Sequence, residues 1–141
     1  MLKKYRIPPI YLEIEIAENA YLQSGHAVLD TEEKLRQCGF RVVMDGFDGD
    51  YIALNTIESI NADAIKLDLR RFNGKISQSL LNTVFDQAAS LKLTLSAEGI
   101  ENMEQMNMLR KCGCSEGQGF FLSKPISVKE FEEVINGVAG K

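Results

Sequence analysis

The chain has 141 residues, which is the size of one ordinary domain and too short for a multidomain enzyme. Hydrophobic residues make up 45% and charged residues 26%, proportions that exclude a disordered or collagen-like chain. The net charge of −4 argues against general electrostatic binding to nucleic acid or to an anionic membrane.

Strand-like and helix-like runs alternate along the chain. The expected strands are 11–16, 41–45, 64–68, 93–98 and 118–122, and the expected helices are 30–38, 52–60, 77–91, 101–111 and 128–138. The strands start at intervals of 30, 23, 29 and 25 residues, which is the length of a strand plus a crossover helix. Because parallel strands need such crossovers, the sequence predicts an α/β fold with about five parallel strands.

The three cysteines, Cys38, Cys112 and Cys114, form no pattern of pairs, and their spacing does not suit a zinc ribbon. We therefore expect buried or half-buried free thiols, as in a reducing cytoplasm. No apolar run approaches the roughly 20 residues of a membrane-spanning helix. These observations together favour a cytoplasmic location.

Acidic residues close four of the five expected strands, with one lysine among them. They are Glu13, Glu15 and Glu18 around the first strand, Asp45, Asp48 and Asp50 after the second, Asp68 after the third, and Glu98 and Glu101 after the fourth. In parallel α/β folds, functional groups gather at the carboxyl ends of the strands. Carboxylate clusters with few other charges suit Mg²⁺ or Mn²⁺.

Simpler interpretations exist for the same residues. Glu13 and Glu15 alternate with apolar neighbours, so they could form an outward-facing polar stripe. The 45–50 segment could be an acidic turn, and its spacing does not match an EF-hand. Lys66 could form a plain salt bridge to Asp45 or Glu98 inside the fold.

Several short motifs follow one another in a fixed order. They are Leu12–Glu18 (LEIEIAE), Ile65–Asp68 (IKLD), Ala97–Glu101 (AEGIE), Cys112–Cys114 (CGC), Gln118–Phe120 (QGF) and Ser123–Pro125 (SKP). In this order and at this spacing they resemble the EAL domain, the bacterial cyclic di-GMP phosphodiesterase module used in signal transduction. The similarity runs from about residue 8 to residue 135.

The resemblance implies a TIM-like (β/α) barrel of about 250 residues, of which this chain would be the C-terminal part. The amino-terminal part, with the E-A-L motif itself and a strand that supplies an Asn ligand, has no counterpart here. We therefore expect residues 1–141 to form a truncated EAL-like domain, a partial TIM-like barrel of about five parallel strands with crossover helices.

The resemblance also implies two-metal hydrolysis of cyclic di-GMP to pGpG, with Mg²⁺ or Mn²⁺ activating a water. By matching position, Glu15, Asp45 and Glu98 would be metal ligands, and Lys66 would be the catalytic residue that orients the water. Support for the loop, the substrate and the metals would come from Glu18, Glu101 and Gln118.

One loop departs from the family pattern. Where the family typically reads D-D-F-G-T-G, residues 45–50 read DGFDGD, so Gly46 replaces a ligand, and Asp48 and Asp50 replace glycines. Loss of several ligands is expected to weaken or abolish metal binding and to leave little activity in this chain alone. A regulatory or cyclic di-GMP-binding role is then favoured.

Two alternatives stay open. The chain could be a metal-dependent phosphodiesterase that is completed by the missing amino-terminal part or by a second chain, or it could be a protein-interaction domain without nucleotide binding. Five strands cannot close an eight-stranded barrel, so the end strands and the inner face would be exposed. This predicts a homo-oligomer, foremost a symmetric dimer, unless the missing part covers them.

Overall fold

The structure is a computed structural model that describes residues 2–47, 61–72 and 76–139. Its strands are β1 (Glu13–Ala17), β2 (Arg41–Phe47), β3 (Ala64–Asp68), β4 (Thr94–Glu98) and β5 (Glu116–Gly117). Its helices are α1 (Leu2–Tyr5), α2 (Glu18–Gln37), α4 (Gln78–Ser90), α5 (Met103–Lys111) and α6 (Val128–Ala139), with short 3₁₀ turns at Pro9–Tyr11 and Leu69–Phe72. The helix expected at 52–60 lies outside the described residues.

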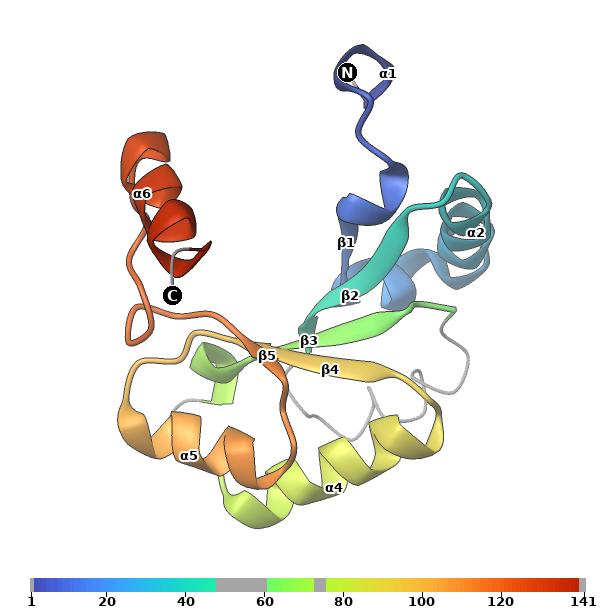
Figure 1. Cartoon of the computed structure of the whole chain (residues 1–141). Coiled ribbons are helices and arrows are strands. Elements are labelled where there is room, and N and C mark those ends of the chain that lie inside the picture. Colours follow the sequence, from blue (N-terminus) through green and yellow to red (C-terminus); the bar gives the residue numbers. More distant parts are fainter. Residues whose placement is uncertain (1, 48–60, 73–75, 140–141) are drawn as a thin grey trace.

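The strands form one parallel sheet in the order β1-β2-β3-β4-β5. Each strand pairs with the next one along the chain, as strands do in a (β/α) barrel. Helices α4 and α5 lie side by side under the β3–β4 part of the sheet, and α2 flanks its β1–β2 end (Figure 1). The predicted α/β class with parallel strands is confirmed.

Alternating side chains divide the sheet into two faces. The face toward the helices is apolar and includes Val42, Met44, Ile65, Leu67 and Leu95, all buried. Leu81, Val84 and Ala88 recur at helical spacing on α4 and pack into the same core. Full burial of one such side chain contributes about 1.5–3 kcal/mol to the free energy of folding. The opposite face is therefore free to carry polar groups.

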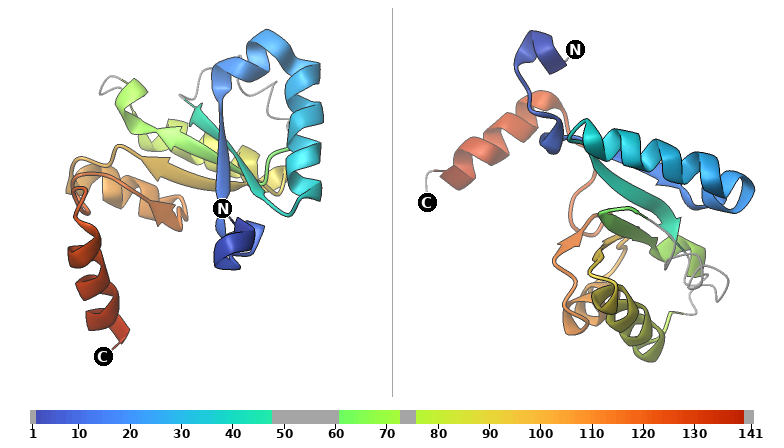
Figure 2. Two further views of the ribbon diagram at one scale, coloured as in Figure 1. Left: turned by 90° about the horizontal axis from the view of Figure 1, so that it is seen from above. Right: turned by 90° about the vertical axis from the view of Figure 1, so that its right-hand side faces the viewer.

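Helix α2 is longer than the predicted 30–38 helix, and it turns a corner (Figure 2, left). The Tyr21 hydroxyl donates a hydrogen bond to Glu32, which is fully buried. In a straight helix those residues would lie about 16 Å apart along the axis, so the bond requires the bend. Ser24-Gly25 lies between them, and such pairs are common at kinks.

The fifth strand was predicted wrongly. Strand β5 is Glu116–Gly117, and the expected strand at 118–122 is instead a turn. Backbone bonds define that turn: Phe121 N–H donates to Ile100 O at 3.1 Å, and Leu122 N–H donates to Gly119 O at 3.0 Å. The chain thus folds over Ile100 instead of continuing along the sheet. The thiols are free as expected, but Cys38 is exposed rather than buried.

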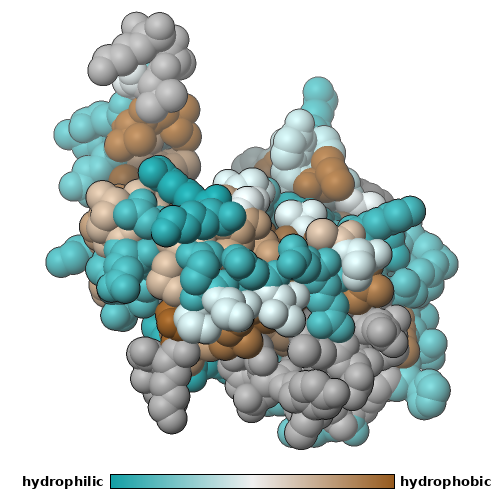
Figure 3. Space-filling model, turned by 90° about the horizontal axis from the view of Figure 1, so that it is seen from below, coloured by the Kyte–Doolittle hydropathy of each residue, from teal (hydrophilic) through white to brown (hydrophobic). Residues whose placement is uncertain are grey.

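Helix α6 projects from the body on the side of the sheet opposite α4 and α5 (Figures 1 and 2). Its apolar side chains are half exposed or more, and in Figure 3 they form hydrophobic surface at the upper left. They are Val128, Phe131, Val134 and Ile135. Near the other end of the chain, Ile10 and Tyr11 are also exposed. Within the described residues, no helix has the length and apolarity needed to cross a membrane.

Candidate functional site

The predicted site residues that lie on strands share the face of the sheet that points away from the helices. Register places Ala17 beside Asp45, Asp45 beside Lys66, and Asp68 beside Glu98. Paired residues of a parallel sheet point the same way, and so do alternate residues of one strand. Glu15, two residues before Ala17, therefore lies on this face too. Four strands bring the carboxylates together around one lysine.

Lys66 is the centre of this face. Its side chain is only 10% exposed, and its ammonium group is bonded to the carboxylate of Glu15. Burial by itself would lower the pKa of Lys66, but the bond to Glu15 and the charges of Glu15, Asp45 and Glu98 raise it above its ordinary value. Lys66 is thus a fixed cation. The salt bridge expected to Asp45 or Glu98 is formed with Glu15 instead.

Asp45 differs from the other carboxylates. Its Oδ1 atom is buried and accepts no hydrogen bond from the described residues. A buried carboxylate oxygen without a donor is costly unless a cation or a further donor reaches it. Asp45 is therefore an available ligand at this face.

Glu98 and Asp68 are held by Arg70, which follows β3. Arg70 Nε donates to Asp68 Oδ1 at 2.8 Å and Nη2 donates to Asp68 Oδ2 at 3.1 Å. The Nη2 group also bonds Glu98 Oε1, while Gln118 Nε2 donates to Glu98 Oε2 at 3.0 Å. Burial would raise the pKa of Asp68, but the bonds from Arg70 and the charges of both arginines lower it.

Gly46 lies in an irregularity of β2, where the register skips from Asp45 to Phe47. Its φ of +82° is a left-handed conformation that glycine adopts without strain. Arg71 packs over it: Nη1 donates to Gly46 O at 2.6 Å and lies 3.4 Å from a carboxylate oxygen of Glu18. The predicted role of Glu18 as a support for this loop agrees with that contact and stays a prediction.

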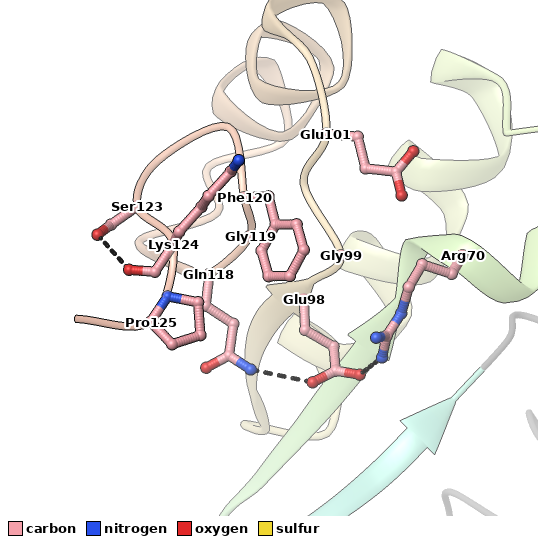
Figure 4. A pocket seen from close by; sticks show the side chains of 10 residues that line it. All are labelled: Arg70, Glu98, Gly99, Glu101, Gln118, Gly119, Phe120, Ser123, Lys124 and Pro125. Carbon is pink, nitrogen blue, oxygen red and sulfur yellow. Dashed lines mark hydrogen bonds and ion pairs between the residues drawn. The ribbon is translucent and has the colours of Figure 1, made fainter. Parts of the chain in front are cut away.

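A pocket of about 380 Å³ opens beside Glu98 (Figure 4). It is lined by Arg70, Glu98, Gly99, Glu101, Gln118, Gly119, Phe120, Ser123, Lys124 and Pro125. Glu98 stands between Arg70 and Gln118, and the exposed ring of Phe120 lies near Lys124. The pocket combines two cations, Arg70 and Lys124, with two carboxylates, Glu98 and Glu101, and the ring of Phe120 offers a surface on which a planar base can stack.

The structure thus brings Glu15, Asp45 and Lys66 together, and it places Glu98, Glu101 and Gln118 at the adjoining pocket. Sequence reasoning missed Arg70 and Arg71. The signal was available as two adjacent arginines directly after an expected strand end rich in acids. Among the described residues, no three His, Cys, Asp or Glu side chains are grouped so that they could hold a metal ion.

Comparison with known proteins identifies the family. A family model described as "EAL domain" matches residues 1–125 of the chain. The chain belongs to the EAL domain family. The parallel sheet with its helices is accordingly a partial form of the TIM-like barrel of EAL domains.

Named relatives include a cyclic di-GMP phosphodiesterase. RocR of Pseudomonas aeruginosa, which bears that description, is 29% identical over 142 residues that cover 97% of this chain and 36% of RocR. The chain spans 15–36% of the length of eight curated relatives that it matches.

Solved structures give the same fold. The EAL domain of Mycobacterium smegmatis DcpA superposes with a TM-score of 0.84 at 28% identity, covering 96% of this chain and 63% of that one. Klebsiella pneumoniae BlrP1, in a manganese and cyclic di-GMP complex, superposes with a TM-score of 0.74 at 26% identity, covering 84% and 31%. BlrP1 also forms a calcium complex with the dinucleotide.

The pair of divalent ions that the EAL resemblance implies fits the described residues poorly. Asp45 offers an unpaired oxygen, but Glu15 is bonded to Lys66 and Glu98 to both Arg70 and Gln118. Basic side chains already compensate two of the three predicted metal ligands. Within the described ranges, the donor set leaves room for at most one cation, beside Asp45.

Proposed function

We propose that this chain is a truncated, degenerate EAL-type domain that binds cyclic di-GMP and has a regulatory role, with little hydrolysis by the chain alone. Family membership and the related cyclic di-GMP complex of BlrP1 support the choice of ligand. The cytoplasm, where no membrane span would be needed, is the expected location.

One observation carries the proposal: carboxylates from separate strands converge around Lys66 on one face, next to a pocket that contains Arg70 and Lys124. The face carries Glu15, Asp45, Lys66 and Glu98, which the EAL resemblance predicts for a cyclic di-GMP site, whereas Gly46 stands where a further ligand is expected. The two cations match the charge of a phosphodiester, and the ring of Phe120 offers a surface on which a base can stack.

The weak hydrolysis is inferred from the charge arrangement. Gly46 supplies no side-chain ligand, and Lys66 and Arg70 hold Glu15 and Glu98 in ion pairs. An enzyme that stabilises phosphoryl charge with metals needs those carboxylates free to ligate. Loss of a single group that stabilises the transition state typically costs about 10²–10³ in rate.

The free oxygen of Asp45 favours a second candidate. In this alternative, Mg²⁺ or Mn²⁺ binds when another part of the domain or another chain adds ligands, and the completed site hydrolyses cyclic di-GMP to pGpG. The chain covers 63% of the DcpA EAL domain, and β1 is an end strand of the described sheet, so we propose that a completing part pairs with the edge of β1.

We further propose that the exposed apolar surface of α6 and the free edge of β1 are covered by that part or, in its absence, by a second copy in a symmetric dimer. Size-exclusion chromatography with light scattering at micromolar concentration should give twice the chain mass of 15.8 kDa. A clean monomer under these conditions would exclude the dimer.

Calorimetry with cyclic di-GMP, combined with chromatographic detection of pGpG, tests the main proposal. Binding without product is expected for the chain alone. Lys66→Gln should weaken binding or remove any residual turnover, whereas Lys34→Gln, which removes an exposed lysine on α2, should change neither. Efficient metal-dependent pGpG formation would support the second candidate, and absence of binding at high protein concentration would favour an interaction domain.

A further inference from the structure

Three interactions hold Arg70 in the site: a backbone hydrogen bond, a guanidinium–carboxylate pair and packing of its aliphatic stem. Its backbone N–H donates to Asp68 Oδ1 at 3.0 Å, and its guanidinium forks onto both oxygens of the same carboxylate. Its aliphatic stem lies against Gly99, where a Cβ atom would approach Arg70 Cγ to 2.8 Å. A side chain larger than hydrogen at position 99 would therefore displace Arg70.

The guanidinium balances the carboxylate charge on this side of the site. Both oxygens of Asp68 accept from Arg70, and the two oxygens of Glu98 accept from Arg70 and Gln118. A divalent ion at Glu98 would have to displace the single bond from Arg70 Nη2 or the one from Gln118, and it would then lie beside the positive charge of Arg70, which its bidentate pair with Asp68 holds in place. Bidentate pairs between arginine and carboxylate are among the stronger polar contacts in proteins.

The neighbouring arginine, Arg71, also lies where the family pattern has a carboxylate. Arg71 places its guanidinium over Gly46, so that a Cβ at that position would meet Nη2 at 3.0 Å and Cζ at 3.1 Å. Position 46 is where the family pattern has a second aspartate. A guanidinium thus occupies the space next to a backbone that lacks the carboxylate.

We infer that Arg70 is a built-in cation that has replaced a divalent metal ion at Glu98, so that this chain binds cyclic dinucleotide without metal on that side of the site. The inference rests on the proposed function for its ligand, but the exchange of metal for arginine is a separate claim. Arg70 Nη1 donates no hydrogen bond within the described part of the chain and is left to face a ligand phosphate. Its side chain is 58% exposed and lines the same pocket as Lys124.

Manganese titration of the 141-residue chain tests the exchange directly, with the electron paramagnetic resonance of free Mn²⁺ as the readout. The wild-type chain should show no site at Glu98. Arg70→Gln removes the guanidinium that Asp68 and Glu98 share and should raise the Mn²⁺ affinity at least about tenfold. Arg36→Gln is the matched control, because Arg36 is a half-exposed arginine paired with Asp63 away from the site; it should leave the affinity unchanged.

The Mn²⁺ result decides the inference whether or not the nucleotide binds. Failure of Arg70→Gln to raise the Mn²⁺ affinity above that of the wild type and of Arg36→Gln would overturn it. Arg70→Lys, which keeps the charge but loses the fork, should bind Mn²⁺ less well than Arg70→Gln. Circular dichroism melting curves confirm that each variant is folded.

A second titration uses cyclic di-GMP in EDTA and in Mn²⁺. The wild-type dissociation constant should agree within about twofold between the two, and Arg70→Gln should bind about tenfold more weakly in EDTA and recover in Mn²⁺. A wild-type chain that binds the nucleotide only with Mn²⁺ would contradict the inference but not the proposed function. Absence of nucleotide binding in both buffers would contradict the proposed function. The Mn²⁺ titration would still test whether Arg70 takes the place of a metal ion.

Discussion

Replacement of Gly119 by alanine should severely destabilise the turn that forms one wall of the pocket. A Cβ at position 119 would lie 2.7 Å from the carbonyl carbon of Ile100 and closer still to its nitrogen and oxygen, whereas ordinary contact begins near 3.4 Å. Backbone, not a flexible side chain, would have to move. The movement strains two hydrogen bonds, from Ile100 N–H to Gln118 O at 3.2 Å and from Phe121 N–H to Ile100 O at 3.1 Å.

The expected cost follows from these contacts. Overpacking against a rigid neighbour costs about 1–3 kcal/mol, and each weakened backbone bond adds about 1 kcal/mol, so Gly119→Ala should lose about 3–5 kcal/mol. With a urea slope of about 2–3 kcal/mol/M, the unfolding midpoint would fall by about 1–2.5 M. Gln118 would move as well, so Glu98 would lose a partner and nucleotide binding would weaken.

Gly137→Ala is the matched control, because a Cβ there meets nothing within 4 Å. In helix α6 this change should be neutral or should stabilise the helix by up to about 1 kcal/mol. A midpoint for Gly119→Ala within experimental error of the Gly137→Ala midpoint would refute the packing argument.

Two further changes test the framework of the site. Tyr21→Phe leaves a buried oxygen of Glu32 without its donor and should cost about 1–3 kcal/mol in urea unfolding, whereas Tyr11→Phe, at an exposed ring, should cost almost nothing; equal effects would argue against the buried pair. The lowered pKa of Asp68 means that its pairing with Arg70 stabilises the fold above about pH 4 and is lost as pH falls through the depressed folded value. The stability difference between wild type and Asp68→Asn should therefore shrink between pH 6 and pH 3, and a constant difference would contradict this assignment.

Much of the fold could be predicted from the sequence, because the hydrophobic periodicity and the residues that begin and end helices indicated the same elements. Strand β3 was placed at its observed bounds, and α4 was predicted within one residue because Ser77 caps its start, accepting a bond from Leu80 N–H at 3.2 Å. The first half of α2 was missed, since it mixes polar residues with Ser24-Gly25 and depends on the long-range bond from Tyr21 to Glu32. The 118–122 segment resembled a strand, yet contacts with Ile100 make it a turn.

The site was only partly predictable for a similar reason. Acids at the strand ends gave the location, and the IKLD motif gave Lys66. The partners of those acids depend on the directions of the side chains in three dimensions. Lys66 on β3 pairs with Glu15 on β1, past the intervening strand β2. Arg70 pairs with Asp68, two residues before it, and with Glu98 on β4. No spacing rule in the sequence reports such pairs.

Isothermal titration of the intact chain with cyclic di-GMP, followed by chromatography of the same sample, tests the central claim most directly. The account predicts saturable binding with one dinucleotide per site and recovery of the ligand intact, without pGpG, in the presence of Mn²⁺. Rapid conversion to pGpG by the chain alone would contradict the degenerate site, and absence of any heat at ligand concentrations up to the millimolar range would contradict the site itself.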